Sequence, residues 1–363
     1  MEPVKILDEA DLLAKAEARA GDHGLVSYEF AVPELDPLAV LETLDEPAPR
    51  GYFENPSRRR SHAAGAPVRQ WRGRGEKRFA DADVWLRAID AELTCVGHRP
   101  RVIATFPFYP GTENEGAEAR MFLPGWQVVS EEGVSTVTLV EPAGPGCAAR
   151  LAVRADGFRR FSYRSTPPSP RAPVPTVLSE VGGAWFPSAV LRATELIKEG
   201  SFEKIVLSRA FDWRRSEPFS AYATLHRLRR GNPQCHTFLV DEDEGCLVGS
   251  TPETLLSLFD GAVRSESVAG TTRRGESASE DASLAEALLT SDKDRREHTA
   301  VTASILRRLR MVGVLAATSR NAELLRLGNV MHLRTPIEGT MPADRRFLEV
   351  AGELHPTPAV GGK

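Results

Sequence analysis

Lys204 is the first residue whose type and setting could do chemistry. The spacing of apolar residues predicts a strand over Lys204–Phe211, whose other residues are largely apolar or small. A lysine in such a strand either extends to the surface, which is the commoner case, or is held buried. Burial disfavours the charged ammonium group, so a buried lysine loses its proton easily and can act as a base. The pattern alone leaves both interpretations open.

Glu253 is the second candidate. It follows Gly249-Ser250-Thr251-Pro252, a turn-forming stretch, and opens a predicted strand over Glu253–Phe259. A tight turn can present a carboxylate to a cleft, although an exposed glutamate at a strand start is the more common outcome. Spacing alone favours the exposed glutamate.

A third group lies in the first turns of a predicted helix over about Asp294–Met311. Asp294, Glu297 and His298 occur there. Acidic side chains near a helix N-terminus commonly complement the helix dipole. They are also suitable ligands for a hard cation such as Mg²⁺.

The elements that must position these residues are mixed helices and strands. They lack the strict alternation of a doubly wound sheet, so the predicted class is α+β. Asn55–Gly75 is polar and Arg-rich and is interpreted as a long surface loop. Strands are predicted at Leu25–Phe30, Val102–Phe106, Trp126–Val129, Val134–Val140, Cys235–Val240, Cys246–Ser250, Ala262–Val268 (joined to Glu253–Phe259 by an Asp260-Gly261 turn) and Asn329–Thr335. Helices are predicted at Ala80–Leu93, from Ser188 to about Gly200, and at Ser220–Arg230.

The clearest change in composition is the Pro-rich stretch Thr166–Pro175, which can continue neither a helix nor a central strand. It divides a β-rich N-terminal portion, residues 1–165, from residues 177–363, which carry the candidate site. The connection itself spans 166–176.

Composition excludes several classes of protein. Apolar residues make up 41% and charged residues 26% of the 363 residues, with a formal net charge of -4, so no strong field attracts nucleic acid or a membrane surface. The four cysteines are dispersed, and Cys95 with His98 forms only a lone CxxH, a poor zinc site. The start of the chain has no apolar core of signal-peptide length, and no stretch could span a bilayer. We therefore expect a soluble cytoplasmic protein.

Several strings together resemble one family, the chorismate-binding enzymes. These are FEKIVLSRA (202–210), GSTPETLL (249–256), AGTTRRG (269–275), LLTSDKDRREH (288–298), VMHLRTPIEGT (330–340) and LHPTPAVGG (354–362). They occur in the family's order and rough spacing, and the resemblance is good from about Phe186 onward. It implies a single α+β sandwich, with the Pro-rich stretch internal to it.

The resemblance also implies residue roles. Lys204 matches the lysine that activates water for attack on the chorismate ring, and Glu253 matches the acid that protonates the departing 4-hydroxyl. Glu297 matches a carboxylate that binds Mg²⁺, the implied cofactor, which holds the ring carboxylate of the substrate. The other matched positions contact the substrate: Gly270, Thr271, His332, Thr357, Ala359 and Val360. This chemistry requires neutral Lys204 and protonated Glu253 near neutral pH, and burial shifts both groups in that direction.

Two features favour water rather than ammonia as the nucleophile. Ammonia-using members generally have glutamine at the position of Lys204 and an SGAPK-like ending where this chain has PTPAVGG. The resemblance thus implies an isomerase, an isochorismate synthase, with chorismate as its partner and no glutamine amidotransferase subunit. Salicylate synthases share the lysine but typically have an ASG-like segment, and they are the alternative enzyme.

Family members continue beyond PTPAVGG, with a second Mg²⁺-binding glutamate, a tyrosine, an arginine and a GAGI-like loop. We therefore expect the 363-residue chain to be a C-terminally truncated form, itself inactive and prone to associate. A non-catalytic remnant is the alternative from a different class. A form of family length is expected to convert chorismate to isochorismate with Mg²⁺, for menaquinone or siderophore synthesis.

Overall fold

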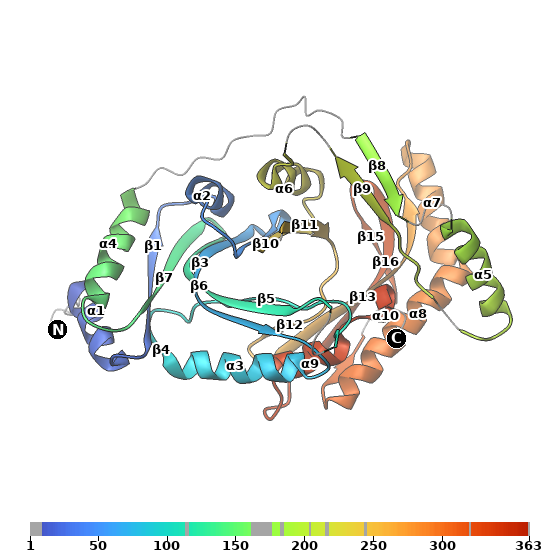
Figure 1. Cartoon of the computed structure of the whole chain (residues 1–363). Helices are drawn as coiled ribbons and strands as arrows, with labels where there is room; N and C mark the ends of the chain where they lie inside the picture. The colour runs from blue at the N-terminus through green and yellow to red at the C-terminus, as the bar shows by residue number, and fades with distance from the viewer. Residues whose placement is uncertain are drawn as a thin grey trace, which may run out of the picture. The chain divides into compact units, whose positions relative to one another are not determined.

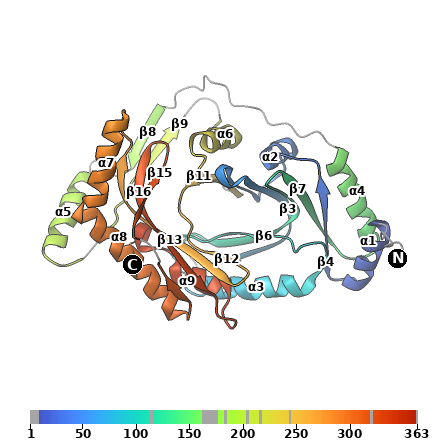
Figure 2. The same cartoon turned by 180° about the vertical axis from the view of Figure 1, so that it is seen from behind.

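The computed structural model describes residues 9–112, 116–160, 176–181, 185–202, 205–214, 218–242, 245–318 and 321–361. The Pro-rich stretch and Lys204 lie outside them. Contacts divide the chain into two compact units, Met1–Pro168 with Ala221–Pro252, and Ser169–Ser220 with Glu253–Lys363 (Figures 1 and 2). Residues 221–252, which the sequence places in the C-terminal portion, thus pack within the first unit.

The first unit is built on a nine-stranded sheet in the order β11-β10-β2-β3-β6-β7-β1-β4, with β5 beside β6. Its strands are β1 Leu25–Val32, β2 Arg50–Asn55, β3 Arg60–Gly73, β4 Leu93–Val96, β5 Ile103–Thr105, β6 Ala119–Glu131, β7 Val134–Pro142, β10 His236–Glu242 and β11 Gly245–Thr251. Its helices are α1 Glu9–Ala20, α2 Pro37–Leu44, α3 Arg78–Glu92, α4 Cys147–Arg160 and α6 Ala221–Gly231, with a 3₁₀ turn at Pro56–Arg58. The β1–β4 pair is parallel, and the other pairs are antiparallel.

Alternation along the strands divides the core of this sheet between its two faces. Val26, Tyr28 and Phe30 of β1 pack in the cluster that includes residues of α1, α2, α4 and α6. Leu25, one position away, packs instead with Ile89 of α3. Successive side chains of a strand point to opposite faces, so α3 covers one face and the other four helices cover the opposite face.

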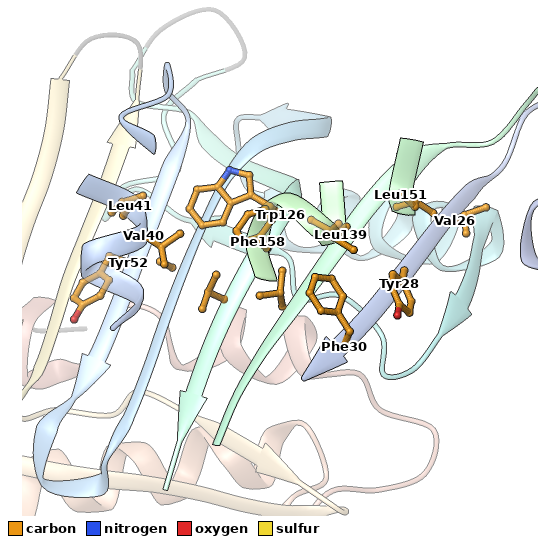
Figure 3. Packing of buried hydrophobic residues seen from close by; sticks show 14 of the residues in the cluster. Val26, Tyr28, Phe30, Val40, Leu41, Tyr52, Trp126, Leu139, Leu151 and Phe158 are labelled. Carbon is orange, nitrogen blue, oxygen red and sulfur yellow. The ribbon is translucent and has the colours of Figure 1, made fainter. Parts of the chain in front are cut away.

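Trp126 of β6 lies at the centre of the larger cluster, with Phe158 of α4 beside it (Figure 3). Its side chain is 1% exposed, and its indole nitrogen donates a hydrogen bond to Glu46 at 2.5 Å. Fully burying a large apolar side chain stabilises a fold by roughly 1.5–3 kcal/mol. This aromatic cluster is therefore a main source of the first unit's stability.

The prediction of a long surface loop over Asn55–Gly75 is wrong. Residues Arg60–Gly73 form β3, which pairs with β2 on one side and β6 on the other. Its register shifts at a bulge between Pro67 and Arg69, so the period-two pattern that signals a strand is interrupted. Small buried residues, Ala63 and Ala64, take the place of the usual β-branched ones.

The second unit contains a five-stranded sheet in the order β12-β13-β16-β14, with β15 also paired to β16, and a two-stranded sheet of β8 and β9. Its strands are β8 Thr176–Val181, β9 Ala210–Arg214, β12 Ser257–Phe259, β13 Ala262–Arg273, β14 Leu315–Ala317, β15 Glu323–Arg326 and β16 Val330–Thr340. Its helices are α5 Phe186–Lys198, α7 Ala278–Thr290, α8 Asp292–Met311, α9 Phe347–Leu354 and α10 Pro358–Gly361.

Helix α8 covers one face of the five-stranded sheet (Figure 1). Val301, Ile305 and Leu309 recur at helical spacing and are buried in a cluster with Val263 and Ile337. Helix α7 packs on the same sheet through Met331 and Leu333 of β16. These contacts fix the first turns of α8, which carry Glu297, against β13 and β16.

In its described part, the predicted strand Lys204–Phe211 is confirmed only at Ala210 and Phe211. Residues 205–209 form no strand, and β9 begins only at Ala210. Ile205 and Val206 are exposed, so the apolar spacing that predicted the strand is not matched by burial. The neighbouring prediction of a hairpin turn is confirmed, since Asp260 and Gly261 join β12 to β13 with φ of 47° and 74°, as a type I′ turn requires.

Each unit combines a largely antiparallel sheet with helices that do not alternate with its strands. The predicted α+β class is confirmed.

Candidate active site

Glu253 lies in the loop between β11 and β12. The loop is tied to β13 by two hydrogen bonds, from the Thr254 N–H to Glu266 Oε1 at 2.8 Å and from the Ser265 hydroxyl to the Leu255 carbonyl at 2.8 Å. The predicted strand therefore begins at Ser257 rather than at Glu253. The ties hold the backbone that carries Glu253 against the sheet.

The carboxyl group of Glu253 is partly buried, and its pKa is raised. Burial is the main cause, and the negative charge of Glu266 adds to it. The Thr357 hydroxyl donates a hydrogen bond to Glu253 Oε1 at 3.3 Å and opposes the rise, because it stabilises the ionised form. An acid whose pKa is raised toward neutrality can hold a proton to donate.

Thr271 and His332 are opposite each other on β13 and β16. The Thr271 hydroxyl and His332 Nδ1 are 2.9 Å apart. His332 alternates with Met331 and Leu333, which pack with α7, so its side chain lies on the face of the sheet away from that helix. Burial lowers the pKa of His332, and a hydrogen bond with the Gly270 backbone opposes that shift. A neutral imidazole therefore lies beside a hydroxyl on this face.

Gly270 forms a β-bulge between Ala269 and Thr271, with φ of +81°. A Cβ atom added there would lie 3.2 Å from Asp294 Cβ and 3.3 Å from Leu333 Cδ1. Glycine thus permits both the left-handed backbone and the close approach of β13 to the start of α8.

His298 holds the start of α8 to the sheet. Its Nδ1 donates to the Ala269 carbonyl at 3.3 Å, and its Nε2 lies 2.7 Å from the Thr335 hydroxyl. Because a carbonyl only accepts, Nδ1 carries the proton and the Thr335 hydroxyl donates to Nε2 of the neutral ring. Burial lowers the pKa of His298, which agrees with a neutral ring. Glu297, the residue before it, is partly buried.

Glu297 is the residue that the family resemblance assigns to a Mg²⁺ ion, and a partly buried carboxylate is a suitable ligand for that ion. Mg²⁺ in enzymes usually keeps several waters and binds through one or two carboxylates. A search of the described ranges finds no group of three or more His, Cys, Asp or Glu side chains able to hold a metal by themselves. Glu297 therefore suits one position in a shared coordination shell.

The remaining predicted positions differ in their setting. Thr357 is buried beside Glu253, and Ala359 of α10 packs against the cluster under α8. Val360 is exposed. Lys204 lies outside the described residues, so its role stays a prediction.

Sequence reasoning missed Glu266, Arg334 and Thr335. Arg334 donates from Nε to Glu266 Oε2 at 2.7 Å, and Thr335 bonds His298. Charged residues within the predicted strands Ala262–Val268 and Asn329–Thr335 were the available signal for the first two. The hydroxyl of Thr335 had no such signal, because threonine is common in strands.

None of the helices in the described ranges is both long enough and apolar enough to cross a membrane.

Comparison with known proteins agrees with this geometry. Residues 11–363 match the model of the family described as chorismate binding enzyme. The chain is 30% identical over 355 residues to the salicylate biosynthesis isochorismate synthase of Pseudomonas aeruginosa, covering 93% of this chain and 73% of the relative. It is 34% identical over 178 residues to the isochorismate synthase EntC of Escherichia coli, covering 49% of this chain and 46% of EntC.

Solved structures show the same fold. The structure resembles MenF, the menaquinone-specific isochorismate synthase of Escherichia coli, with a TM-score of 0.75 at 23% identity, over 96% of this chain and 79% of MenF. Anthranilate synthase component I of Streptococcus pneumoniae matches with a TM-score of 0.62 at 16% identity, over 83% of this chain and 73% of that protein. With the family model covering nearly the whole sequence, the chain belongs to the chorismate-binding enzymes.

Proposed function

We propose that the protein is an isochorismate synthase that isomerises chorismate to isochorismate in a Mg²⁺-dependent reaction. One observation carries the proposal. At the position that the family resemblance assigns to the general acid, Glu253 is partly buried, its pKa is raised, and the Thr357 hydroxyl donates a hydrogen bond to it. The names of the similar proteins, which include isochorismate synthases from two bacteria, support the same reaction.

The reaction moves a hydroxyl group around the ring without net oxidation or reduction. Water forms a new C–O bond at one ring carbon, both ring double bonds shift by one position, and the bond to the 4-hydroxyl breaks. Lys204 takes the proton from the attacking water, and Glu253 gives a proton to the departing hydroxyl, so that it leaves as water. Each proton transfer by a positioned side chain contributes typically 10²–10⁴-fold to a rate.

The pH dependence follows from the state each group must have. Glu253 must be protonated, so activity is present below its folded-state pKa and is lost as pH rises through that value. Burial raises this pKa and extends activity toward neutral pH. Lys204 must be neutral, so activity rises as pH passes its pKa. Together the two groups predict a bell-shaped profile.

The other residues orient the substrate. Thr271, His332 and the Gly270 backbone form one polar surface on β13 and β16, able to hydrogen-bond the carboxylates and hydroxyl of chorismate. Glu297 would hold the Mg²⁺ ion. When bound, the ion offsets charge on the ring carboxylate and orients the ring.

The test measures the products formed from chorismate. Because the chain spans 73% of its Pseudomonas aeruginosa relative, two proteins are assayed, the 363-residue chain and a form extended with the relative's remaining residues, called here the extended enzyme. The extended enzyme should form isochorismate with Mg²⁺, lose turnover in excess EDTA and regain it with added Mg²⁺. The 363-residue chain is assayed in parallel under the same conditions.

Product identity separates the alternatives. Pyruvate released in step with chorismate consumption would favour a salicylate synthase, and anthranilate formed from added ammonia would contradict water as the nucleophile. Undiminished turnover in EDTA would contradict the role of Mg²⁺. An extended enzyme that folds and binds chorismate but forms no isochorismate would refute the proposed function.

A further inference from the structure

Glu266 is a buried carboxylate in the middle of β13. It is 7% exposed, and its two oxygens have different partners. Oε1 accepts a hydrogen bond from the Thr254 backbone N–H at 2.8 Å, and Oε2 accepts one from Arg334 Nε at 2.7 Å. A buried charge is costly unless it is paired and hydrogen-bonded. Both oxygens of Glu266 meet that condition.

Arg334 pairs with Glu266 and holds its carboxylate in place. The arginine lies on β16, the strand paired with β13, and its Nη1 also contacts Glu323 Oε1 of β15 at 3.3 Å. Glu323 is the more exposed partner, with 40% of its side chain accessible. One arginine thus joins a buried carboxylate and a more exposed one across three strands.

Glu266 also acts on the residue next to Thr254. The hydrogen bond from the Thr254 N–H fixes the backbone one position from Glu253, and the charge of Glu266 lies close enough to Glu253 to disfavour its ionisation. Thr357, on the other side, donates a hydrogen bond to Glu253. The negative charge that acts on Glu253 thus belongs to Glu266 of β13, whose carboxylate is itself paired with Arg334.

We propose that Glu266 is a positioning residue for the general acid: its carboxylate, paired with Arg334, fixes the Glu253 loop through the Thr254 N–H and places a negative charge beside Glu253. The inference rests on the proposed role of Glu253 in chorismate isomerisation. It adds that the ion pair between Glu266 of β13 and Arg334 of β16 affects the position and the protonation of Glu253 on a neighbouring loop.

The decisive variant is Glu266→Gln. Glutamine keeps the length of the side chain and can still accept from the Thr254 N–H, but it removes the charge. The pKa of Glu253 should then fall, because one of the causes that raises it is lost. Glu323→Gln is the matched control, since it removes a carboxylate from the same arginine away from Glu253. That variant should leave the titration of Glu253 unchanged.

The titration is measured in the 363-residue chain, without substrate, by ¹³C NMR of carboxyl-labelled glutamate, with Glu253→Gln identifying the signal. This readout does not depend on turnover, so it stands even if the proposed function fails. A Glu253 titration that is the same in Glu266→Gln and in the unmodified chain would overturn the proposal. In the extended enzyme, the high-pH limb of kcat/KM should also move to lower pH in Glu266→Gln only.

Glu266→Asp tests whether Glu266 positions the Glu253 loop. It also provides a second, charged variant in case the neutral Glu266→Gln protein does not fold. Aspartate keeps the charge beside Arg334 but is one methylene shorter, so it withdraws from the Thr254 N–H. A displacement of about 1 Å can cost about 10²-fold in rate, so kcat of the extended enzyme should fall roughly 10²-fold with KM little changed. Unmodified kcat in Glu266→Asp would contradict positioning, and a matching rise in KM alone would indicate a substrate contact instead.

Discussion

The two main sheets of this protein both bury apolar and polar side chains, but among the described strand residues only the second buries a carboxylate, Glu266. The sheet of the first unit encloses Trp126 and Tyr52, both fully buried, in a cluster of aliphatic residues. In the second unit, β13 and β16 bury Glu266 and Thr335, which are hydrogen-bonded to Arg334 and His298. Apolar burial stabilises without direction, whereas buried polar groups cost free energy unless each has a partner. The aromatic cluster of the first sheet is therefore a source of stability, and the paired polar groups of the second sheet fix the orientation of reactive groups.

This comparison predicts that substitutions in the two sheets have separable effects. Changes at the polar positions of the second unit should reduce turnover more than stability. Changes in the aromatic cluster of the first unit should reduce stability more than turnover per folded molecule.

The largest expected effect is on turnover, from Glu253→Gln in the extended enzyme. The amide keeps the shape of the side chain but cannot donate the acidic proton, so kcat should fall roughly 10²–10⁴-fold. Chorismate should still bind, and the midpoint of urea unfolding should not fall, because a partly buried carboxyl with a raised pKa is removed. Glu338→Gln is the control, an exposed glutamate on β16 that should keep normal turnover. Near-normal turnover in Glu253→Gln would assign the proton donor elsewhere.

Lys204→Ala should reduce turnover of the extended enzyme over the same range, roughly 10²–10⁴-fold, if the lysine is the general base. The low-pH limb of the profile should disappear with it, because that limb reports the base. A variant that keeps the limb would show that another group accepts the proton from water.

Trp126→Ala should have the largest effect on stability. Truncating a buried tryptophan typically costs about 3–5 kcal/mol, through lost transfer free energy and the remaining cavity. Val134→Ala, at an exposed position of the neighbouring strand β7, should change stability by less than about 0.5 kcal/mol. Both are measured by urea unfolding of the 363-residue chain. A Trp126→Ala protein as stable as the control would remove the distinction between the two sheets.

His298→Leu is intermediate, because it affects both stability and the site. Leucine fills a similar volume but leaves the Ala269 carbonyl and the Thr335 hydroxyl without their partner, at a cost of about 1–3 kcal/mol. It also frees the start of α8, so the Mg²⁺ concentration needed for half-maximal turnover of the extended enzyme should rise. His298→Asn, whose amide nitrogen can donate to Ala269, should recover part of both losses. A loss of stability with unchanged Mg²⁺ dependence would limit His298 to a role in folding.

Sequence patterns predicted elements whose signals are local. The Asp260-Gly261 turn and helix α8 both followed from residue type and spacing. The predicted strand ending at Thr335 instead continues to Thr340 through Pro336. A central strand is hydrogen-bonded on both sides, and proline has no N–H to donate. However, β15 pairs with residues 331–334 of β16, and β14 pairs with residues 338–340. In the described residues, position 336 therefore falls between these two partner strands. Which partner covers each part of a strand could not be derived from the chain alone.

The candidate site shows the same limit. Glu253 and Glu297 were predicted from motifs, but Glu266 acts through a hydrogen bond to a residue 12 positions away, and Arg334 through an ion pair across 68 positions. Such pairs depend on strand register, because a shift of one residue would turn Glu266 to the other face of the sheet. The residues that contact substrate carry a motif, whereas those that set their protonation do so through tertiary structure.

The smallest effect is expected from Thr357→Val, and its direction is the sharpest test of the charge balance at Glu253. Valine has nearly the shape of threonine, so packing is kept and only the hydroxyl is lost. That hydroxyl donates to Glu253 Oε1 and favours the ionised form, so its removal should raise the pKa of Glu253 further. The high-pH limb of kcat/KM in the extended enzyme should therefore move to higher pH, opposite to the shift in Glu266→Gln.

Thr290→Val is the control, because it removes a hydroxyl that bonds only backbone carbonyls within α7. The change is small because burial, the main cause of the raised pKa, is untouched. A limb that moves to lower pH in Thr357→Val would mean that the hydroxyl accepts the Glu253 proton instead of donating its own, and the protonated acid would then depend on Thr357 rather than on Glu266.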